Sequence, residues 1–433
     1  ALFAVHPLHV EPVAWISSRK DLLFTVFYLL ALMIYFKYRH SQKNFFLFIS
    51  IFLIILSCLS KPSAVSFPLV LTAYLFLMEK DFSLKKYLHL IPFYAISLVF
   101  GIITLIGANQ LDLRVQADKG YNFMESLMLG TYSLPNYIIK TVIPVNLSNY
   151  YPYPLPGGEF PLEYKLSPII FIGIIVFCVF LYKKNRQLLF LFLFSILVVL
   201  PVLRFSPMGF PMVADRYFYL GSFGILAIPA FMYCNYISWQ KWILYPGILL
   251  LLVYTVMSHQ QLKIWENSKT LWTNTIDLYP KFYYAYRERG RFYYMINQKE
   301  KALEDYNQAL KLNSQDVNIL TEVANLEIEL GLEKNVLELQ NKAVEKNGDA
   351  ATYYNRANTY KSKNEFDLAI RDYDKALELD PELAQAYNNR GICHIMTNDT
   401  TSAVNDFEKA YKLKPQNEMF KNNYLRLKNM LGD

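Results

Sequence analysis

The sequence predicts an all-α protein made of a multi-pass α-helical membrane domain followed by a water-soluble solenoid of helical repeats. Three observations predict this fold class. Hydrophobic residues make up 54% of the 433 residues, long apolar segments recur before Ser258, and small residues recur after it with a period of 33 or 34 residues. We therefore predict a membrane domain over residues 1–260 and a repeat domain over residues 261–433.

The membrane domain is expected to contain eight spans. A spanning helix needs about 20 mostly apolar residues, and tilting or snorkelling of polar flanks can extend a shorter segment. The predicted spans are 22–36, 44–60, 64–78, 87–106, 166–182, 187–205, 218–237 and 241–257. A further apolar stretch, 121–143, is interrupted by Glu125, Pro135 and Lys140. We predict an interfacial or re-entrant helix there.

The distribution of positive charge supports this topology. Residues 1–260 carry 19 Lys and Arg against 10 Asp and Glu, whereas residues 261–433 carry 24 against 26. With eight spans, all the basic loops fall on one side, which the positive-inside rule assigns to the cytoplasm. These loops are 37–43, 80–86, 183–186 and the weaker one at Lys241. The remaining loops and the repeat domain then share the extracytoplasmic face, and the basic excess does not indicate nucleic-acid binding.

The repeat domain is defined by small residues that let two helices of one unit approach closely. Gly290, Ala324, Ala357 and Gly391 occupy equivalent places in four units over about 283–417. A half repeat that ends at Pro280 precedes them, and residues 418–433 read as a polar capping helix. This pattern resembles the tetratricopeptide repeat (TPR), and that resemblance implies a concave groove that binds a peptide or partner protein.

The first helix of each TPR unit lines such a groove. Packing between helices is the alternative role for the tyrosines on these helices. The candidate groove residues are Tyr284, Arg287, Tyr354, Asn355, Asn388 and Asn389.

Three segments on the predicted outer face carry further signals, His6–Asp21, Pro144–Pro154 and Met212–Leu220. Together with Leu59–Pro62 and the TPR array, they resemble the transmembrane-and-TPR family of O-mannosyltransferases and its bacterial relatives. The resemblance implies a GT-C type glycosyltransferase that takes a sugar from a polyprenyl phosphate. It also implies a catalytic aspartate in an outer loop that would precede Ala1. We therefore expect the chain to be truncated at its N-terminus and inactive by itself.

Cations at the outer ends of spans are candidates to bind the donor phosphate and to stabilise it as the glycosidic bond breaks. These candidates are Arg19, Lys20, Lys61 and Arg216. Their alternative role is that of interfacial anchors. Asp21 and Asp215 adjoin basic residues, so we expect orienting ion pairs rather than a catalytic base there.

His6, His9 and Glu11 could bind a divalent cation, although Pro7 and Pro12 prevent regular helical spacing of the three ligands. A hydrogen-bonded cluster that shapes the donor pocket is the favoured interpretation, with Glu11 or His9 held in reserve as a general base.

Tyr151, with its neighbours Tyr150 and Tyr153, could stack on a sugar ring. The alternative for these tyrosines is an interfacial aromatic belt.

These observations favour a membrane enzyme that transfers a hexose, such as mannose, from a polyprenyl-phosphate donor to a protein acceptor on the extracytoplasmic side. The TPR arm would recruit the acceptor. The alternatives are a non-catalytic TPR scaffold for envelope assembly and a surface-glycan polymerase or ligase. Because the array is short, we expect a bacterial cytoplasmic membrane rather than the endoplasmic reticulum. No Gly-rich phosphate loop, GxSxG elbow or CxxC pair occurs in the sequence.

Overall fold

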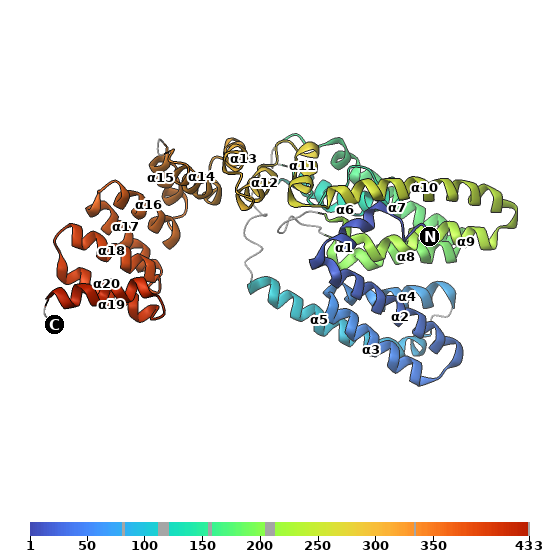
Figure 1. Cartoon of the computed structure of the whole chain (residues 1–433). Coiled ribbons are helices and arrows are strands. Elements are labelled where there is room, and N and C mark those ends of the chain that lie inside the picture. The colour runs from blue at the N-terminus through green and yellow to red at the C-terminus, as the bar shows by residue number, and fades with distance from the viewer. Residues whose placement is uncertain (80–82, 111–120, 155–157, 204–212, 333–334, 432–433) are drawn as a thin grey trace. The chain divides into compact units, whose positions relative to one another are not determined.

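The computed structural model of the chain describes residues 1–79, 83–110, 121–154, 158–203, 213–332 and 335–431 (Figure 1). Every secondary-structure element within these residues is a helix, which confirms the predicted all-α class. Of the segments singled out in the sequence, Lys80 in a basic loop and Met212 in the third outer segment lie outside the described residues.

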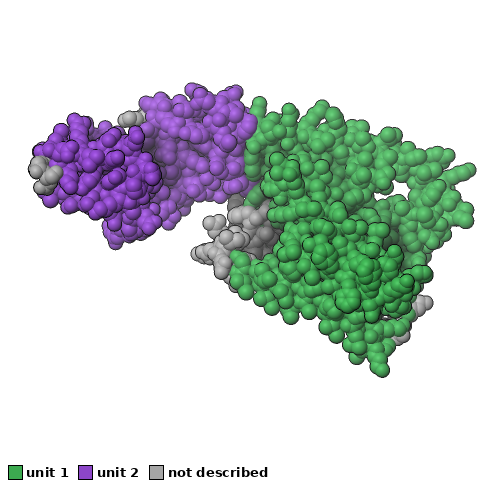
Figure 2. All heavy atoms as spheres, turned by 60° about the horizontal axis from the view of Figure 1, so that its bottom comes forward, with its two compact units in different colours: residues 1–279 green, residues 280–433 purple. Residues whose placement is uncertain are grey.

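The chain divides into two compact units, Ala1–Tyr279 and Pro280–Asp433 (Figure 2). The predicted boundary at 260 falls within helix α10. Helix α11, which was expected to form a half repeat, belongs to the first unit. The reason is a set of contacts with the loop before Tyr151. Asn274 Nδ2 donates to the Leu147 carbonyl over 3.0 Å, and the Thr275 hydroxyl donates to Asn149 Oδ1 over 2.5 Å.

The first unit contains eleven α-helices in its described part. They are α1 (Val10–Ala14), α2 (Arg19–Ser41), α3 (Asn44–Ser60), α4 (Phe67–Met78), α5 (Ile91–Gln110), α6 (Phe123–Val142), α7 (Leu162–Lys184), α8 (Arg186–Val199), α9 (Tyr219–Asn235), α10 (Gln240–Ile264) and α11 (Ser268–Leu278). Short 3-10 helices join several of them, and three of these matter below: η2 (Ile16–Ser18), η3 (Pro62–Ser66) and η6 (Asp215–Phe218).

Five helices in the described residues are long and apolar enough to cross a membrane. They are Ile16–Ser41, Leu84–Gly107, Leu162–Lys184, Asp215–Asn235 and Gln240–Ile264. Three shorter apolar helices, Asn44–Ser60, Pro62–Met78 and Arg186–Val202, coincide with the other three predicted spans. Each predicted span therefore lies on an apolar helix, and the count of eight crossings stays a prediction.

Small and hydroxylated residues allow the apolar helices of this unit to pack closely. Ser50 and Ser57 of α3 donate to backbone carbonyls of α2, at 2.8 and 3.0 Å. Gly224 of α9 lies against α8, where an added Cβ would be 2.3 Å from the Leu191 carbonyl oxygen. Such contacts are typical of helices that associate without a hydrophobic driving force between them.

Helix α6 differs from the spans because its polar residues point into the protein. Asn122 caps its N-terminus in a reciprocal capping box with Glu125. Glu125 and Lys140 are buried, whereas Phe123 and Val142 near its two ends are exposed. Because Glu125 and Lys140 are buried inside the protein, the exposed surface near the two ends of α6 can be apolar although the helix contains two charged residues.

The second unit contains nine α-helices in its described part. They are α12 (Tyr283–Met295), α13 (Lys299–Leu312), α14 (Val317–Glu329), α15 (Val336–Lys346), α16 (Ala350–Ser362), α17 (Phe366–Leu379), α18 (Ala384–Met396), α19 (Thr400–Leu413) and α20 (Glu418–Leu431). Consecutive helices from α12 to α19 pair within repeats. Gly290 faces the Tyr306 ring and Gly391 faces the Phe407 ring, so larger residues at these two glycines would clash. The predicted small-residue register thus matches the packing.

Candidate functional site

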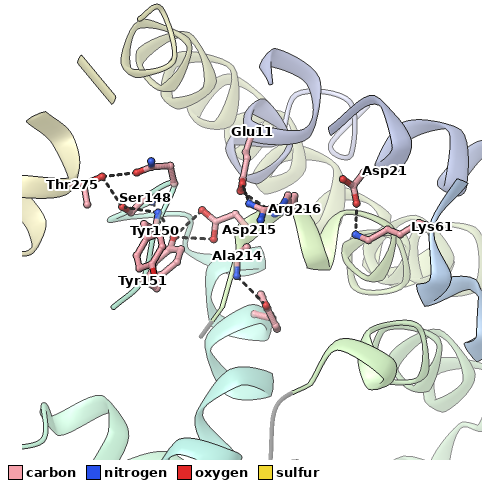
Figure 3. A network of polar contacts seen from close by, with 12 residues as sticks. Glu11, Asp21, Lys61, Ser148, Tyr150, Tyr151, Ala214, Asp215, Arg216 and Thr275 are labelled. Atoms are coloured by element: carbon pink, nitrogen blue, oxygen red, sulfur yellow. Dashed lines mark hydrogen bonds and ion pairs between the residues drawn. The ribbon is translucent and has the colours of Figure 1, made fainter. Parts of the chain in front are cut away.

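The candidate site lies in the first unit, where the N-terminal segment, the start of α2, the end of α3 and the start of α9 meet. Figure 3 shows the polar contacts that connect these segments. Two ion pairs form one part of the network, and a buried tyrosine with two charged partners forms the other. Each part contains residues that the sequence marked as candidates.

Glu11 of α1 and Arg216 of η6 form the first ion pair. The Arg216 backbone amide also donates to Glu11 Oε2 over 3.0 Å. Burial raises the pKa of Glu11, and the Arg216 guanidinium opposes this shift. The guanidinium lies over the rings of Trp15 and Tyr217, at 4.9 and 5.0 Å from their centres. One face of this cation is thus held by a carboxylate and aromatic rings.

Asp21 of α2 and Lys61 form the second ion pair. Lys61 is the residue between α3 and η3, and its ammonium lies 5.0 Å from the centre of the Tyr217 ring. Burial lowers the pKa of Lys61, which the Asp21 carboxylate opposes. Because the Tyr217 ring centre lies 5.0 Å from both the Lys61 ammonium and the Arg216 guanidinium, the structure brings these two predicted cations together at one ring.

The other two predicted phosphate ligands, Arg19 and Lys20, are exposed on the first turn of α2. Lys20 is close enough to Lys61 for its charge to lower the pKa of that ammonium further. The four cations therefore differ in setting, since Lys61 and Arg216 are held by carboxylates whereas Arg19 and Lys20 face the surroundings. Of the four, buried Lys61 and half-buried Arg216 occupy fixed positions.

Asp215 accepts a hydrogen bond from Tyr151, which in turn accepts one from Lys140. The Tyr151 hydroxyl lies 2.8 Å from each carboxylate oxygen of Asp215 and donates to that group. The same hydroxyl accepts from Lys140 Nζ over 2.6 Å and from the Ser148 amide over 3.0 Å. Burial raises the pKa of Tyr151 and lowers that of Lys140. Tyr151 thus serves as a buried polar link, and its ring also packs under the Lys140 ammonium at 3.9 Å.

Lys140 was not a candidate in the sequence, where it served only to mark the stretch 121–143 as interrupted. A signal was nevertheless present. A lysine within an apolar helix is costly unless it faces a partner inside the protein, so its occurrence there indicates a buried contact. The sequence could not identify the partners, because they are not local. Tyr151 lies 11 residues after Lys140, and Asp215, which binds Tyr151, lies a further 64 residues along the chain.

His6 and His9 form hydrogen bonds that connect the N-terminal segment to helices α6 and α9. His6 Nε2 lies 2.9 Å from the Thr141 carbonyl oxygen, and His9 Nε2 lies 2.8 Å from Ser222 Oγ. Burial lowers the pKa of His6 to about 4 and that of His9 to about 3, so both rings are neutral near pH 7. The two histidines therefore act as hydrogen-bonding groups in the wall of the site.

No group of three His, Cys, Asp or Glu side chains converges as a metal site in the part of the chain that the structure describes. His6 and His9 direct ring nitrogens at backbone and serine groups, and Glu11 directs its carboxylate at Arg216. These three residues do not point at a common centre.

In the second unit, the candidate groove residues are largely engaged with one another and with neighbouring repeats. Asn389 Nδ2 donates to Asn358 Oδ1 over 2.9 Å and lies 3.3 Å from the Tyr354 hydroxyl. Asn388 accepts from Asn423 of α20 over 2.8 Å. These contacts join successive first helices.

The remaining candidates, two on the first repeat and Asn355 on the third, have a different environment. Arg287 forms a two-pronged ion pair with Glu322 of the next repeat, with both N–O distances at 2.8 Å. Tyr284 and Asn355 are half-buried. Polar atoms of the array thus stabilise repeat stacking, and the peptide-binding role of the six candidates stays a prediction.

Comparison with known proteins gives two kinds of match. Two family models described as tetratricopeptide repeat match residues 350–383 and 372–405. A protein O-mannosyl-transferase of Caenorhabditis elegans is 25% identical over 320 residues, which is 72% of this chain and 45% of that protein. The chain thus spans less than half the length of this relative.

Solved structures of TPR proteins resemble part of this chain. YrrB, described as a TPR protein with an unusual peptide-binding site, is 19% identical, and the match covers 36% of this chain and 80% of YrrB with a TM-score of 0.33. MamA from Desulfovibrio magneticus is 18% identical over 34% of this chain and 84% of MamA, with a TM-score of 0.32. The TPR domain of Arabidopsis OM64 is 27% identical over 26% of this chain and 95% of that domain, with a TM-score of 0.26.

Proposed function

The chain is homologous to a protein O-mannosyl-transferase and carries TPR repeats, and from these findings we propose that it is part of a membrane glycosyltransferase of the GT-C type. The proposed reaction transfers a hexose, such as mannose, from a polyprenyl phosphate to a protein hydroxyl on the extracytoplasmic side. The proposed membrane is the bacterial cytoplasmic membrane. The TPR arm, whose fold indicates binding of a protein or peptide, recruits the acceptor or a partner.

The observation that carries this proposal is the pair of fixed cations, Lys61 and Arg216, each 5.0 Å from the centre of the Tyr217 ring. In such a reaction the bond between the anomeric carbon and the phosphate oxygen breaks, and negative charge develops on the departing phosphate. Preorganised cations in a partly buried site stabilise that charge more effectively than cations in water. Each cation has a carboxylate partner that holds it in place before the donor binds.

The aromatic residues beside these cations suit a lipid-linked ligand. Trp15 is 42% exposed and Ile16 is 72% exposed at the start of the first candidate span. An amphipathic ring and an apolar side chain at this level can contact a prenyl chain, while the adjacent guanidinium contacts its phosphate. Exposed Arg19 and Lys20 add positive charge that attracts the anionic headgroup.

The proposal assigns supporting roles to Glu11 and His9. Glu11 is committed to Arg216, and a histidine whose pKa is lowered to about 3 is a weak base. We therefore place both in the pocket wall and assign neither of them the role of general base.

Transfer assays on the full-length natural protein in membranes test this function. Labelled hexose should pass from a polyprenyl phosphate to a protein acceptor. Lys61→Ala and Arg216→Ala should each lower kcat/KM about tenfold or more, as expected for loss of a charge-assisted contact. Lys165→Ala, which removes an exposed lysine of α7, is the matched control and should retain wild-type kinetics.

Three outcomes would contradict the proposal. Absence of transfer to protein by the wild-type protein would favour the scaffold, and transfer to a lipid-linked glycan would favour a polymerase or ligase. Unchanged kinetics in both Lys61 and Arg216 variants, at equal protein levels, would remove the phosphate assignment. Sidedness is tested separately with a C-terminal tag, which external protease should remove from intact spheroplasts.

A further inference from the structure

Two buried oxygens beside the candidate site have no hydrogen-bond partner among the described residues. They are Oδ2 of Asp21 and Oγ of Ser18. Both residues are 1% exposed, and both belong to the start of α2, where Ser18 is the N-cap residue and Asp21 lies in the first turn. Ser18 does not cap the helix with its side chain, so its hydroxyl is available for another contact.

Unpartnered oxygens of this kind are costly. A buried acceptor without a donor loses the free energy of its hydrogen bonds to water, and the loss is larger for a charged group. Lys61 satisfies only Oδ1 of Asp21, and in Figure 3 the second oxygen points to the side on which Arg216 lies. Native proteins pair nearly all buried polar atoms, so a donor supplied from outside these residues is the expected partner.

The surrounding charges restrict what that donor can be. The charges of Arg216 and Lys20 both act on Lys61, so a cationic ligand would be repelled. An anionic group would be attracted to these cations but repelled by a free carboxylate oxygen. A ligand that places a phosphate on the cations and a neutral hydroxyl on the carboxylate satisfies both requirements. A sugar phosphate has this composition.

We propose that Asp21 Oδ2 and Ser18 Oγ bind hydroxyl groups of the transferred sugar while Lys61 and Arg216 bind its phosphate. This inference rests on the proposed function and adds the residues that recognise the sugar itself. Hydroxyl recognition by a buried charged group discriminates strongly against a ligand that lacks the hydroxyl, because the protein group is then left unpaired. Both oxygens are inaccessible in this structure, so binding requires the side chains that cover them to move.

Monodeoxy donors test this assignment. Transfer by the full-length natural protein is measured with a polyprenyl-phosphate hexose and with its 2-, 3-, 4- and 6-deoxy analogues, for wild type, Asp21→Asn and Ser18→Ala. The Asp21→Asn change keeps one oxygen for Lys61 and replaces the second oxygen with an amide nitrogen that cannot accept a hydrogen bond. Asp277→Asn changes an exposed aspartate of α11 and is the matched control.

With wild type, removal of the recognised hydroxyl should lower kcat/KM by about tenfold or more, and the Asp277 variant should show the same penalty. In Asp21→Asn that penalty should shrink to about twofold, since the partner of the hydroxyl is already gone. An unchanged penalty in this variant overturns the assignment. If Asp21→Asn does not accumulate in membranes, the test uses Ser18→Ala, which leaves the Asp21–Lys61 pair intact. The penalty for the missing donor hydroxyl should shrink in that variant, and an unchanged penalty overturns the assignment.

The experiment separates failure of this inference from failure of the proposed function. Transfer from the parent donor with unaltered deoxy penalties in the variants rejects sugar recognition by Asp21 and Ser18 and leaves the enzyme assignment standing. No transfer from the parent donor by wild type rejects the enzyme assignment, and with it the sugar site. The inference is also rejected if Asp21→Asn or Ser18→Ala changes the loss in kcat/KM that follows removal of the acceptor hydroxyl but not the loss that follows removal of a donor sugar hydroxyl.

Discussion

Tyr151 and Lys140 should stabilise the first unit as one coupled network. The perturbations are Tyr151→Phe, Lys140→Met and the double variant. Tyr151→Phe removes the donor to Asp215 and the acceptor for Lys140, so a buried carboxylate and a buried ammonium both lose a partner. Lys140→Met removes the positive charge that compensates Asp215. Lys140→Met therefore leaves the Asp215 carboxylate without that positive charge, and Tyr151→Phe leaves each of the two charged groups with one hydrogen-bond partner fewer.

The structure sets the size of the effect. Loss of one member of a buried charged group costs about 3–5 kcal/mol of unfolding free energy. For a domain of this size, that corresponds to a lower melting temperature on the order of 6–10 °C. The double variant should cost less than the sum of the two single changes, because Asp215 is already deprived of its contacts after the first change. We expect a coupling free energy of about 1–3 kcal/mol.

Tryptophan fluorescence during heating of the detergent-solubilised protein measures this effect. All five tryptophans lie between Trp15 and Trp272, so the signal reports the first unit and excludes the TPR array. Lys165→Met and Tyr245→Phe are matched controls, since both residues are exposed in the same unit. These controls should shift the melting temperature by less than about 2 °C.

Additive losses in the double variant would show that Lys140 and Tyr151 act independently, which contradicts the network. Melting temperatures equal to wild type in either single variant would show that the hydroxyl or the ammonium is satisfied without the other. Either result would also mean that the polar contacts between α6 and the loop before Tyr151 do not stabilise the packing of these two segments. Wild-type-like controls are needed before either conclusion.

Three further predictions use other parts of the chain. The pKa of His9 is about 3 in the folded protein and near 6.5 when unfolded, so its contribution to stability is retained above pH 6.5 and lost as the pH falls toward 3. A pH change from 7 to 5 should therefore cost wild type about 2 kcal/mol more than it costs His9→Gln, measured by melting at each pH, because both proteins share the loss that comes from His6. Gly224→Ala should lower the melting temperature by several degrees because its Cβ would lie 2.3 Å from a carbonyl oxygen of α8, whereas Gly247→Ala, with no atom within 4 Å of the new Cβ, should not. Arg390→Ala should destabilise the TPR array by about 1–3 kcal/mol, because it removes the two-pronged ion pair with Asp406. The loss should be seen as lower α-helical ellipticity on mild heating. An unchanged thermal transition would show that apolar contacts alone hold these repeats together.

Several features could be predicted from the sequence because they depend on local pattern. Apolar length predicts where the helices of the first unit run, and the small residues at Gly290 and its equivalents predict the repeat register. Arg216 and Lys61 were identifiable as site candidates because charged residues at the ends of apolar segments need a functional or interfacial reason.

The partners of the charged residues could not be predicted in this way. Asp21 adjoins Lys20 in the sequence but pairs with Lys61, 40 residues away. Arg216 pairs with Glu11 at a separation of 205 residues. Successive residues at a helix start point in different directions, so adjacency along the chain says little about contact in space.

By itself, the sequence determined the helical class, the apolar segments, the repeat period and the residue types available for phosphate binding, because each depends on composition or on spacing along one helix. Only the tertiary structure decided which carboxylate holds which cation and that Lys140 belongs to the network. It also decided that one oxygen each of Asp21 and Ser18 finds no hydrogen-bond partner among the described residues. Hydrogen bonds and ion pairs act over about 3 Å, and distances of that size between distant segments are set by how helices pack. The same packing decided that α11 belongs with the first unit, since the Asn274 and Thr275 contacts to the loop before Tyr151 hold it there.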